Sequence, residues 1–192
     1  MSINSTGPEM VRSAFPSLEQ RVAALAQLGK VMAAMGAAQE WPGHVIGLDR
    51  TEYERMDRLV REAVVRNGWA TEENVRHAFA SWGAQLTTTS IATWTAAYPE
   101  LHTPRAPQRV VGLILAGNVP LVGLHDVLCV WISGHRARVK TSSQDPELIP
   151  ALMQVLEHFA PGTAQQIHFS PEKLGEVDAL IATVSTNTAR DF

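Results

Sequence analysis

Apolar residues in the first part of the chain recur at the spacing of an amphipathic helix. Between residues 22 and 35 they stand three or four positions apart, as Val22, Leu25, Leu28, Met32 and Met35. This spacing places them on one stripe of a helix, which is buried when the helix packs. The pattern predicts a helix that Gly36 and Pro42 bring to an end.

Three more helices are predicted before residue 98. A segment from Thr51 has one apolar and one charged face, and Asn67-Gly68 is expected to end it. Thr71 followed by two glutamates is typical of an N-cap with an acidic first turn. A fourth helix is expected over roughly 87–98, so we predict a helical N-terminal region at 1–98.

A cluster of prolines interrupts the helical pattern. Pro99, Pro104 and Pro107 lie within nine residues, and proline breaks a helix because it lacks the N–H donor and clashes with the preceding turn. We therefore predict a linker at 99–108.

After the prolines the pattern becomes that of a parallel β-sheet. Residues 110–115 form a continuous apolar run of the kind found in strands that are covered on both faces. Further strands are predicted at 136–140, 166–169 and 178–184, with helices at about 121–132 and 143–159 between them. Strands separated by helices imply βαβ units. We therefore predict an α/β fold, with helices followed by a partial Rossmann-like parallel sheet domain at 109–192.

The last residues suggest that an element is cut. Ser185 to Thr188 has the composition of a turn and helix cap, and Ala189 to Phe192 would be one helical turn. One turn does not hold itself as a helix in water. We expect the chain to be an N-terminal piece of a longer enzyme.

Composition narrows the classes of function. The 192 residues include 16 Lys and Arg against 19 Asp and Glu, a net charge of −3, which disfavours a partner bound through phosphate neutralisation, such as nucleic acid. The single cysteine excludes an internal disulfide and multi-thiolate metal sites, and it fits a reducing compartment, so we expect a cytoplasmic protein. No apolar run approaches the about 18 residues of a membrane span, and none is expected.

The turn after the first predicted strand is one candidate site, because open parallel sheets bind ligands at the carboxyl ends of their strands. Gly117 lets the backbone approach a cofactor, and Pro120 presets the first turn of a helix whose N–H groups attract anions. Asn118 offers an amide that stabilises an oxyanion. The alternative is an ordinary turn built from ordinary turn residues.

The second candidate lies at the end of the next strand. Alternation places Arg136, Arg138 and Lys140 on one strand face, with Lys140 nearest the carboxyl end and Ser142 in the turn beyond. A cation and hydroxyls there are suited to a ribose or its 2′-phosphate. The residues alone favour a solvated basic edge strand for Arg136 and Arg138.

The third candidate is the hydroxyl-rich turn that contains Thr183, Ser185 and Thr188. It is suited to phosphate or ribose, and taken alone it is equally a helix N-cap.

Other notable residues are interpreted as structural. Cys129 lies in an apolar helix and is expected to be a packing residue. His125 and Asp126 make no triad, the histidines show no ligand spacing, and no metal site is predicted. The core is expected to contain Trp41, Trp69, Trp82 and Trp94.

Several linked motifs in the second half resemble a known family. They are Leu115-Ala116-Gly117-Asn118-Val119-Pro120, Gly123-x-His125-Asp126-x-Leu128-Cys129, Ser133-Gly134-His135, Lys140-Thr141-Ser142-Ser143-Gln144-Asp145 and the stretch from Ala182 to Arg190. In order and spacing they resemble the fatty-acyl-CoA reductase family known from bacterial bioluminescence, a branch of the aldehyde dehydrogenase superfamily. Asn67 to Val75 and Trp94 to Tyr98 look like that family's helical N-terminal region.

The resemblance implies an aldehyde dehydrogenase-like fold and the reduction of an acyl-CoA, or a related acyl thioester, to an aldehyde with NADPH or NADH. Asn118 matches the oxyanion stabiliser, Lys140 and Ser142 match the segment that holds the adenosine ribose, and Thr183, Ser185 and Thr188 match the loop near the cofactor phosphates. The family's nucleophilic cysteine lies in a later domain, and Val184 stands where that loop usually has glycine.

The expected function is therefore the cofactor-binding part of an NAD(P)H-dependent acyl-CoA reductase, inactive without the catalytic cysteine domain. The basic residues of the second strand favour NADPH slightly. The alternative is a non-catalytic nucleotide- or protein-binding α/β module. The acyl chain and the formation of a homo-oligomer are left open.

Overall fold

The computed structural model describes residues 15–103, 108–170 and 173–183. Four helices form the first part of the fold: α1 (Leu18–Gly36), α2 (Arg50–Arg66), α3 (Glu72–Gln85) and α4 (Thr88–Ala96). Short 3₁₀ turns follow α1 (His44–Ile46) and α4 (Pro99–His102). The sequence therefore predicted these helices to within a few residues.

Side-chain caps set the starts of these helices. Thr71 accepts a hydrogen bond from the amide of Asn74 at 3.2 Å, as its sequence context predicts. Asp49 caps α2 in the same way, 2.9 Å from the amide of Glu52, so that helix begins one residue before Thr51. Each cap supplies an acceptor for a backbone N–H that has no partner inside the helix.

Glycines bring α1 and α3 into backbone contact. A Cβ atom on Gly36 would collide with the backbone of Ala80, and one on Gly83 would lie 2.7 Å from the Cα of Ala33. Glycine weakens a helix interior, so its presence here is explained by the close approach of the two backbones. We call the four helices α1 to α4 the helical layer.

The second part of the chain forms a four-stranded parallel sheet in the order β3-β2-β1-β4. Its strands are β1 (Val110–Ile114), β2 (Arg136–Lys140), β3 (Ile167–Phe169) and β4 (Ala179–Ala182), joined through α5 (Leu124–Ile132), α6 (Leu148–Phe159) and the short α7 (Thr163–Gln166). The predicted α/β class with a Rossmann-like half domain is confirmed. The edge-strand interpretation of β2 is wrong, because β2 pairs with both β1 and β3.

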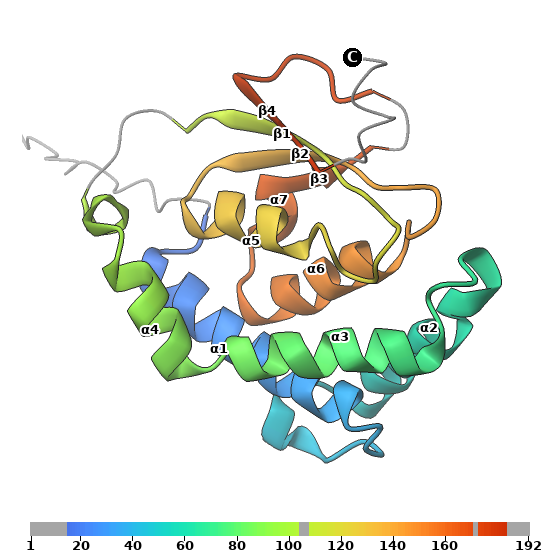
Figure 1. The fold of residues 1–192 in the computed structure, drawn as a ribbon. Helices are drawn as coiled ribbons and strands as arrows, with labels where there is room; N and C mark the ends of the chain where they lie inside the picture. Colours follow the sequence, from blue (N-terminus) through green and yellow to red (C-terminus); the bar gives the residue numbers. More distant parts are fainter. Residues whose placement is uncertain (1–14, 104–107, 171–172, 184–192) are drawn as a thin grey trace, which may run out of the picture.

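The molecule has three layers (Figure 1). The sheet lies above α5 and α6, and α1 packs against the far side of both helices. The side chains of Leu113 and Val139 point into this packing and are fully buried, so they define the inner face of the sheet. One hydrophobic cluster extends from the inner face through the helical layer.

The outer face of the sheet is the opposite one. It carries Gly112, Arg138 and His168, which are partners in the register of β1, β2 and β3. Residues 173–178 cross this face: a Cβ on Gly112 would lie 3.1 Å from Leu174 and 3.2 Å from Val177. Figure 1 shows no helix of the described residues over this face, and Arg136 on it is exposed, whereas Arg138 is half-buried.

Two expected boundaries are corrected. The helix after β1 begins at Leu124, not near residue 121, because Leu121 adopts a left-handed conformation with φ of 60° that a helix does not allow. The next helix begins at Leu148, after a turn that Ser142 and Asp145 close. Pro120 therefore lies in a turn, and it does not start the helix as predicted.

One tryptophan also departs from expectation. Trp69 is 77% exposed and so is not part of the core. Trp41, Trp82 and Trp94 are partly buried against the core, as predicted. Within the described ranges, the helices include none that is long and apolar enough to cross a membrane.

Candidate functional site

The carboxyl edge of the sheet is the set of turns that follow β1, β2 and β4. After β1 the chain crosses to β2 on one side, and β4 later pairs with β1 on the other side. Open parallel sheets bind ligands at such a switch of strand order. The structure therefore places the predicted site residues that it describes, Gly117, Asn118, Pro120, Lys140, Ser142 and Thr183, in the turns at this edge of the sheet.

Lys140 and Thr183 flank the end of β1. Lys140 is the register partner of Ile114 in β2, and the Thr183 amide donates to the Ile114 carbonyl at 2.9 Å from the other side. Both residues were predicted from separate segments, and the sheet brings them to one edge.

Gly117 and Ser142 are in direct contact. A Cβ on Gly117 would collide with the side chain of Ser142 and lie 3.1 Å from the Cβ of Gln144. Only a residue without a side chain fits here. The turn after β1 and the turn after β2 therefore form one continuous surface.

Asp145 joins the same two turns. Its carboxylate accepts a hydrogen bond from the Leu148 amide at 3.3 Å and another from the Leu121 amide in the turn after β1. Burial raises the pKa of Asp145 above its ordinary value, and the two amides partly oppose that shift. Asp145 therefore links the start of α6 to Leu121 in the turn after β1.

Asn67 is the functional residue that sequence reasoning missed. Its side chain is 5% exposed, and its Nδ2 donates to the Gly117 carbonyl at 2.9 Å. Its Oδ1 accepts from the Trp69 amide at 3.0 Å. The dipeptide Asn67-Gly68 was interpreted only as a helix stop, and nothing in its local pattern signals a contact 50 residues away. This contact ties the helical layer to the turn that carries Asn118.

Asn118 itself is exposed, next to the buried Gly117. The helix that follows, α5, has no side-chain cap at Gly123; the Leu124 amide donates to the Leu121 carbonyl at 3.0 Å, and the other N–H groups of its first turn lie at the carboxyl edge. Such N–H groups bind anions. The amide of Asn118 and the start of α5 are both donors on the same side of β1.

Thr183 is engaged differently from the prediction. Its hydroxyl makes a short hydrogen bond to the carboxylate of Asp126 in the first turn of α5. This bond fixes the end of β4 to α5, and it places one negative charge at the edge. Ser185 and Thr188, the other predicted residues of this loop, lie outside the described residues.

Cys129 has the environment of a packing residue. Burial, and then the charge of Asp126, raise the pKa of its thiol. Its Sγ lies 3.6 Å from Nε2 of the exposed His125. A raised pKa disfavours the thiolate that a nucleophile requires. Among the described residues no group of His, Cys, Asp and Glu is placed to hold a metal ion.

The donor set of the carboxyl edge fits a dinucleotide coenzyme. Lys140 is a cation, Ser142 is a hydroxyl against a backbone that approaches closely at Gly117, and the start of α5 offers N–H groups. These groups match a ribose and a pyrophosphate. The carboxylate of Asp126, which lies at the same edge, is opposite in charge to Lys140. Comparison with protein-family models and with curated proteins gives no match for this chain.

Proposed function

We propose that this chain is the cofactor-binding part of an NAD(P)H-dependent acyl-CoA reductase, which reduces an acyl thioester to an aldehyde. The observation that carries the proposal is the contact of Gly117 with Ser142 at the switch of strand order, with Lys140 and Thr183 on either side of β1. These four residues come from three separate segments of the chain and lie at the edge where nucleotides bind in this fold class.

Each residue then has a defined role. Lys140 and Ser142 hold the adenosine ribose, and Lys140 pairs with a 2′-phosphate where the coenzyme carries one. The N–H groups at the start of α5 face the pyrophosphate. The coenzyme, when bound, supplies the hydride.

Asn118 is assigned to the substrate side of the same edge. Its amide donates to the oxygen of the thioester carbonyl as negative charge develops there. Asn67 positions this turn through the Gly117 carbonyl, and Asp145 positions it through the Leu121 amide. Cys129 is the single cysteine of these 192 residues, and its thiol pKa is raised, so it is not the cysteine that forms the thioester. The proposal therefore takes that nucleophile from another polypeptide segment.

The test is a calorimetric titration of NADPH into the wild-type chain and into Lys140→Ala. Loss of a charge-assisted contact is expected to weaken binding by about tenfold or more. Lys30→Ala is the matched control, because Lys30 is an exposed lysine of α1 in the helical layer. Unchanged affinity in Lys140→Ala, or no NADPH binding by the wild-type chain, would overturn the proposal and favour a protein-binding module.

A second assay addresses the reductase chemistry. Acyl-CoA-dependent oxidation of NADPH by this chain alone is expected to show no sustained turnover. Sustained turnover that disappears on alkylation of Cys129 would show that the nucleophile has been misassigned.

A further inference from the structure

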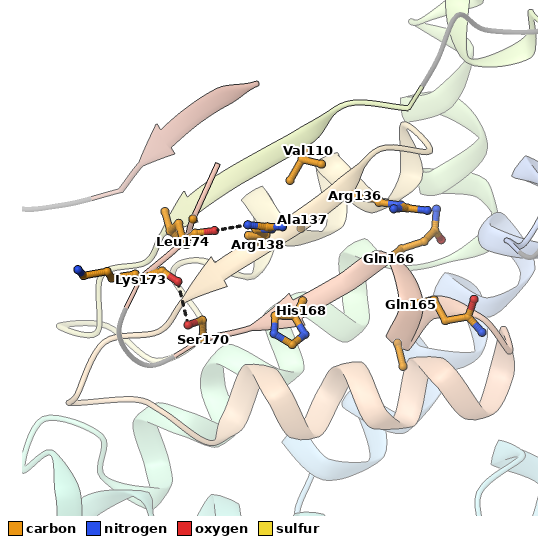
Figure 2. Close-up of a pocket in the computed structure, with 12 residues that line it drawn as sticks. Val110, Arg136, Ala137, Arg138, Gln165, Gln166, His168, Ser170, Lys173 and Leu174 are labelled. Atoms are coloured by element: carbon orange, nitrogen blue, oxygen red, sulfur yellow. Dashed lines mark hydrogen bonds between the residues drawn. The ribbon is translucent and has the colours of Figure 1, made fainter. Parts of the chain in front are cut away.

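The outer face of the sheet holds a pocket of about 630 Å³ that the nucleotide proposal does not use. It lies over β2 and β3 and is bounded by the end of α7 and by the chain around Leu174 (Figure 2). We call it the outer-face pocket, and its polar lining is Arg136, Arg138, Gln165, Gln166, His168, Ser170 and Lys173. Lys140 and the described residues of the turns after β1, β2 and β4 are not among the residues that line it.

The described lining of the outer-face pocket carries positive charge. Arg136 and Arg138 enter from β2 (Figure 2), and within residues 15–103, 108–170 and 173–183 no aspartate or glutamate lines the pocket. The nearby Asp178 accepts a hydrogen bond from the Val110 amide at 2.7 Å. A concentration of arginine and lysine side chains in a pocket attracts anions, even on a chain of net charge −3.

Arg138 is held in position before any ligand binds. Its Nη1 donates to the Leu174 carbonyl at 2.9 Å (Figure 2), and the backbone of Gly175 lies so close that a Cβ there would collide with the guanidinium. The guanidinium of Arg136 lies 5.1 Å from the centroid of the Phe15 ring. Ordered guanidinium groups lose less conformational entropy on binding, which favours affinity.

Gln166 supplies an independent sign of a ligand. Its side chain is 1% exposed, it lines the same pocket, and neither its Nε2 nor its Oε1 has a hydrogen-bond partner. A buried amide without partners costs free energy, and native proteins retain few of them. A ligand oxygen that accepts from Nε2 would remove that cost.

We propose that the outer-face pocket binds the phosphate group of a small phosphorylated molecule. Guanidinium donors match phosphate oxygens, and Figure 2 shows Arg136 beside Gln166, whose Nε2 provides a neutral donor, while Arg138 adds a second cation toward Leu174. Pockets of a few hundred cubic ångströms hold whole small-molecule ligands, so the remaining space accommodates the organic part. The site is separate from the coenzyme site, and either proposal can fail without the other.

The test measures binding of inorganic phosphate by calorimetry at fixed ionic strength, with acetate as the carboxylate comparison. Saturable phosphate binding is expected, with at least tenfold weaker affinity in Arg138→Met and no change in Arg58→Met. Arg58 is the matched control because it is an exposed arginine of α2 and its replacement changes the net charge equally. Glucose 6-phosphate is expected to bind more tightly than phosphate, and glucose is not expected to bind.

Gln166→Met separates a ligand contact from a structural role. The variant is expected to have a higher melting temperature than the wild type without ligand, because it removes the unpartnered amide. Its melting temperature should rise less than that of the wild type when phosphate is added. The proposal is overturned if phosphate fails to bind saturably, if acetate binds as well as phosphate, or if Arg138→Met and Gln166→Met both bind phosphate like the wild type.

Discussion

Arginine side chains in the helical layer and on the outer face of the sheet differ in their partners. In the helical layer, Arg76 is 14% exposed and its guanidinium reaches Asp57 at 2.9 Å, Glu72 at 2.7 Å and the Met35 carbonyl at 2.7 Å. On the outer face, Arg138 contacts a backbone carbonyl and lines a pocket in which no carboxylate was found among the described residues. An arginine that is neutralised inside the protein holds helices together, whereas one that is not neutralised is available to a ligand.

The helical layer and the outer face also differ in how closely they are packed. Glycines in the helical layer close the space between α1 and α3, while the outer face keeps a pocket of about 630 Å³ open. Substitutions in the first region should therefore change stability, and those in the second should change binding.

The largest effect is expected from Arg76→Met. Burial alone would lower the pKa of Arg76, but the hydrogen bonds of Asp57 and Glu72 outweigh it and raise that pKa. Removing the cation leaves Asp57 partly buried with fewer partners, which is expected to lower the free energy of unfolding by about 3 kcal/mol. Urea unfolding measures the change. Phosphate binding by the folded variant should equal that of the wild type, and a loss of binding would break the comparison.

Gly83→Ala comes next. Alanine favours a helix over glycine by about 1 kcal/mol, but here the new Cβ meets the backbone of Ala33, which cannot move aside without separating α1 from α3. A net destabilisation of about 2 kcal/mol is expected from overpacking. Gly68→Ala is the control, since nothing lies within 4 Å of that Cβ position. Equal thermal stability of the two variants would contradict the close-packing account.

Asp145 extends the comparison to a partly buried acid at the carboxyl edge. Asp145→Ala removes the acceptor of the Leu121 and Leu148 amides and is expected to cost roughly 1–2 kcal/mol, whereas Asp145→Asn retains an acceptor and should cost less. Urea unfolding of both variants checks the order.

The pH dependence of Asp145 has a defined sign. Because its pKa is raised in the folded protein, the folded state binds the proton more tightly than the unfolded chain does. The stability of the wild type relative to Asp145→Asn should therefore fall as the pH rises from about 3.9, the ordinary aspartate value, through the raised pKa. If the stability of the wild type relative to Asp145→Asn instead rose with pH over this range, the raised pKa of Asp145 would be contradicted.

The smallest effect on stability is expected from Arg138→Met. This side chain makes one hydrogen bond, to a backbone carbonyl, and is only part-buried, so the free energy of unfolding should change by about 0.5 kcal/mol or less. Thermal melting beside Arg76→Met gives the comparison. A loss as large as that of Arg76→Met would assign Arg138 a structural role.

Local patterns predicted most of the fold. The apolar spacing of α1, the N-cap at Thr71 and the apolar run of β1 each depend on neighbours in sequence, and all three appear in the structure. Boundaries were less accurate where a tertiary contact decides them. Leu121 adopts its left-handed turn where Asp145 accepts its amide, and no pattern within 116–124 reveals that partner.

The candidate sites, like the fold, were predicted only where local patterns decide them. Strand alternation placed Arg136, Arg138 and Lys140 on one face, but their surroundings depend on strand order and on residues 173–178, which the sequence does not disclose. The contact of Asn67 with Gly117 and the unpartnered amide of Gln166 arise only when distant segments meet. Long-range contacts of this kind account for what the sequence did not predict.

The central claim is that the coenzyme binds at the carboxyl edge, separately from the outer-face pocket. The most direct measurement is calorimetry of NADPH with the wild type, Lys140→Ala and Arg138→Met under one set of conditions. The account predicts binding by the wild type, retained affinity in Arg138→Met and a loss of about tenfold or more in Lys140→Ala. Failure of the wild type to bind NADPH, or equal losses in the two variants, would contradict it.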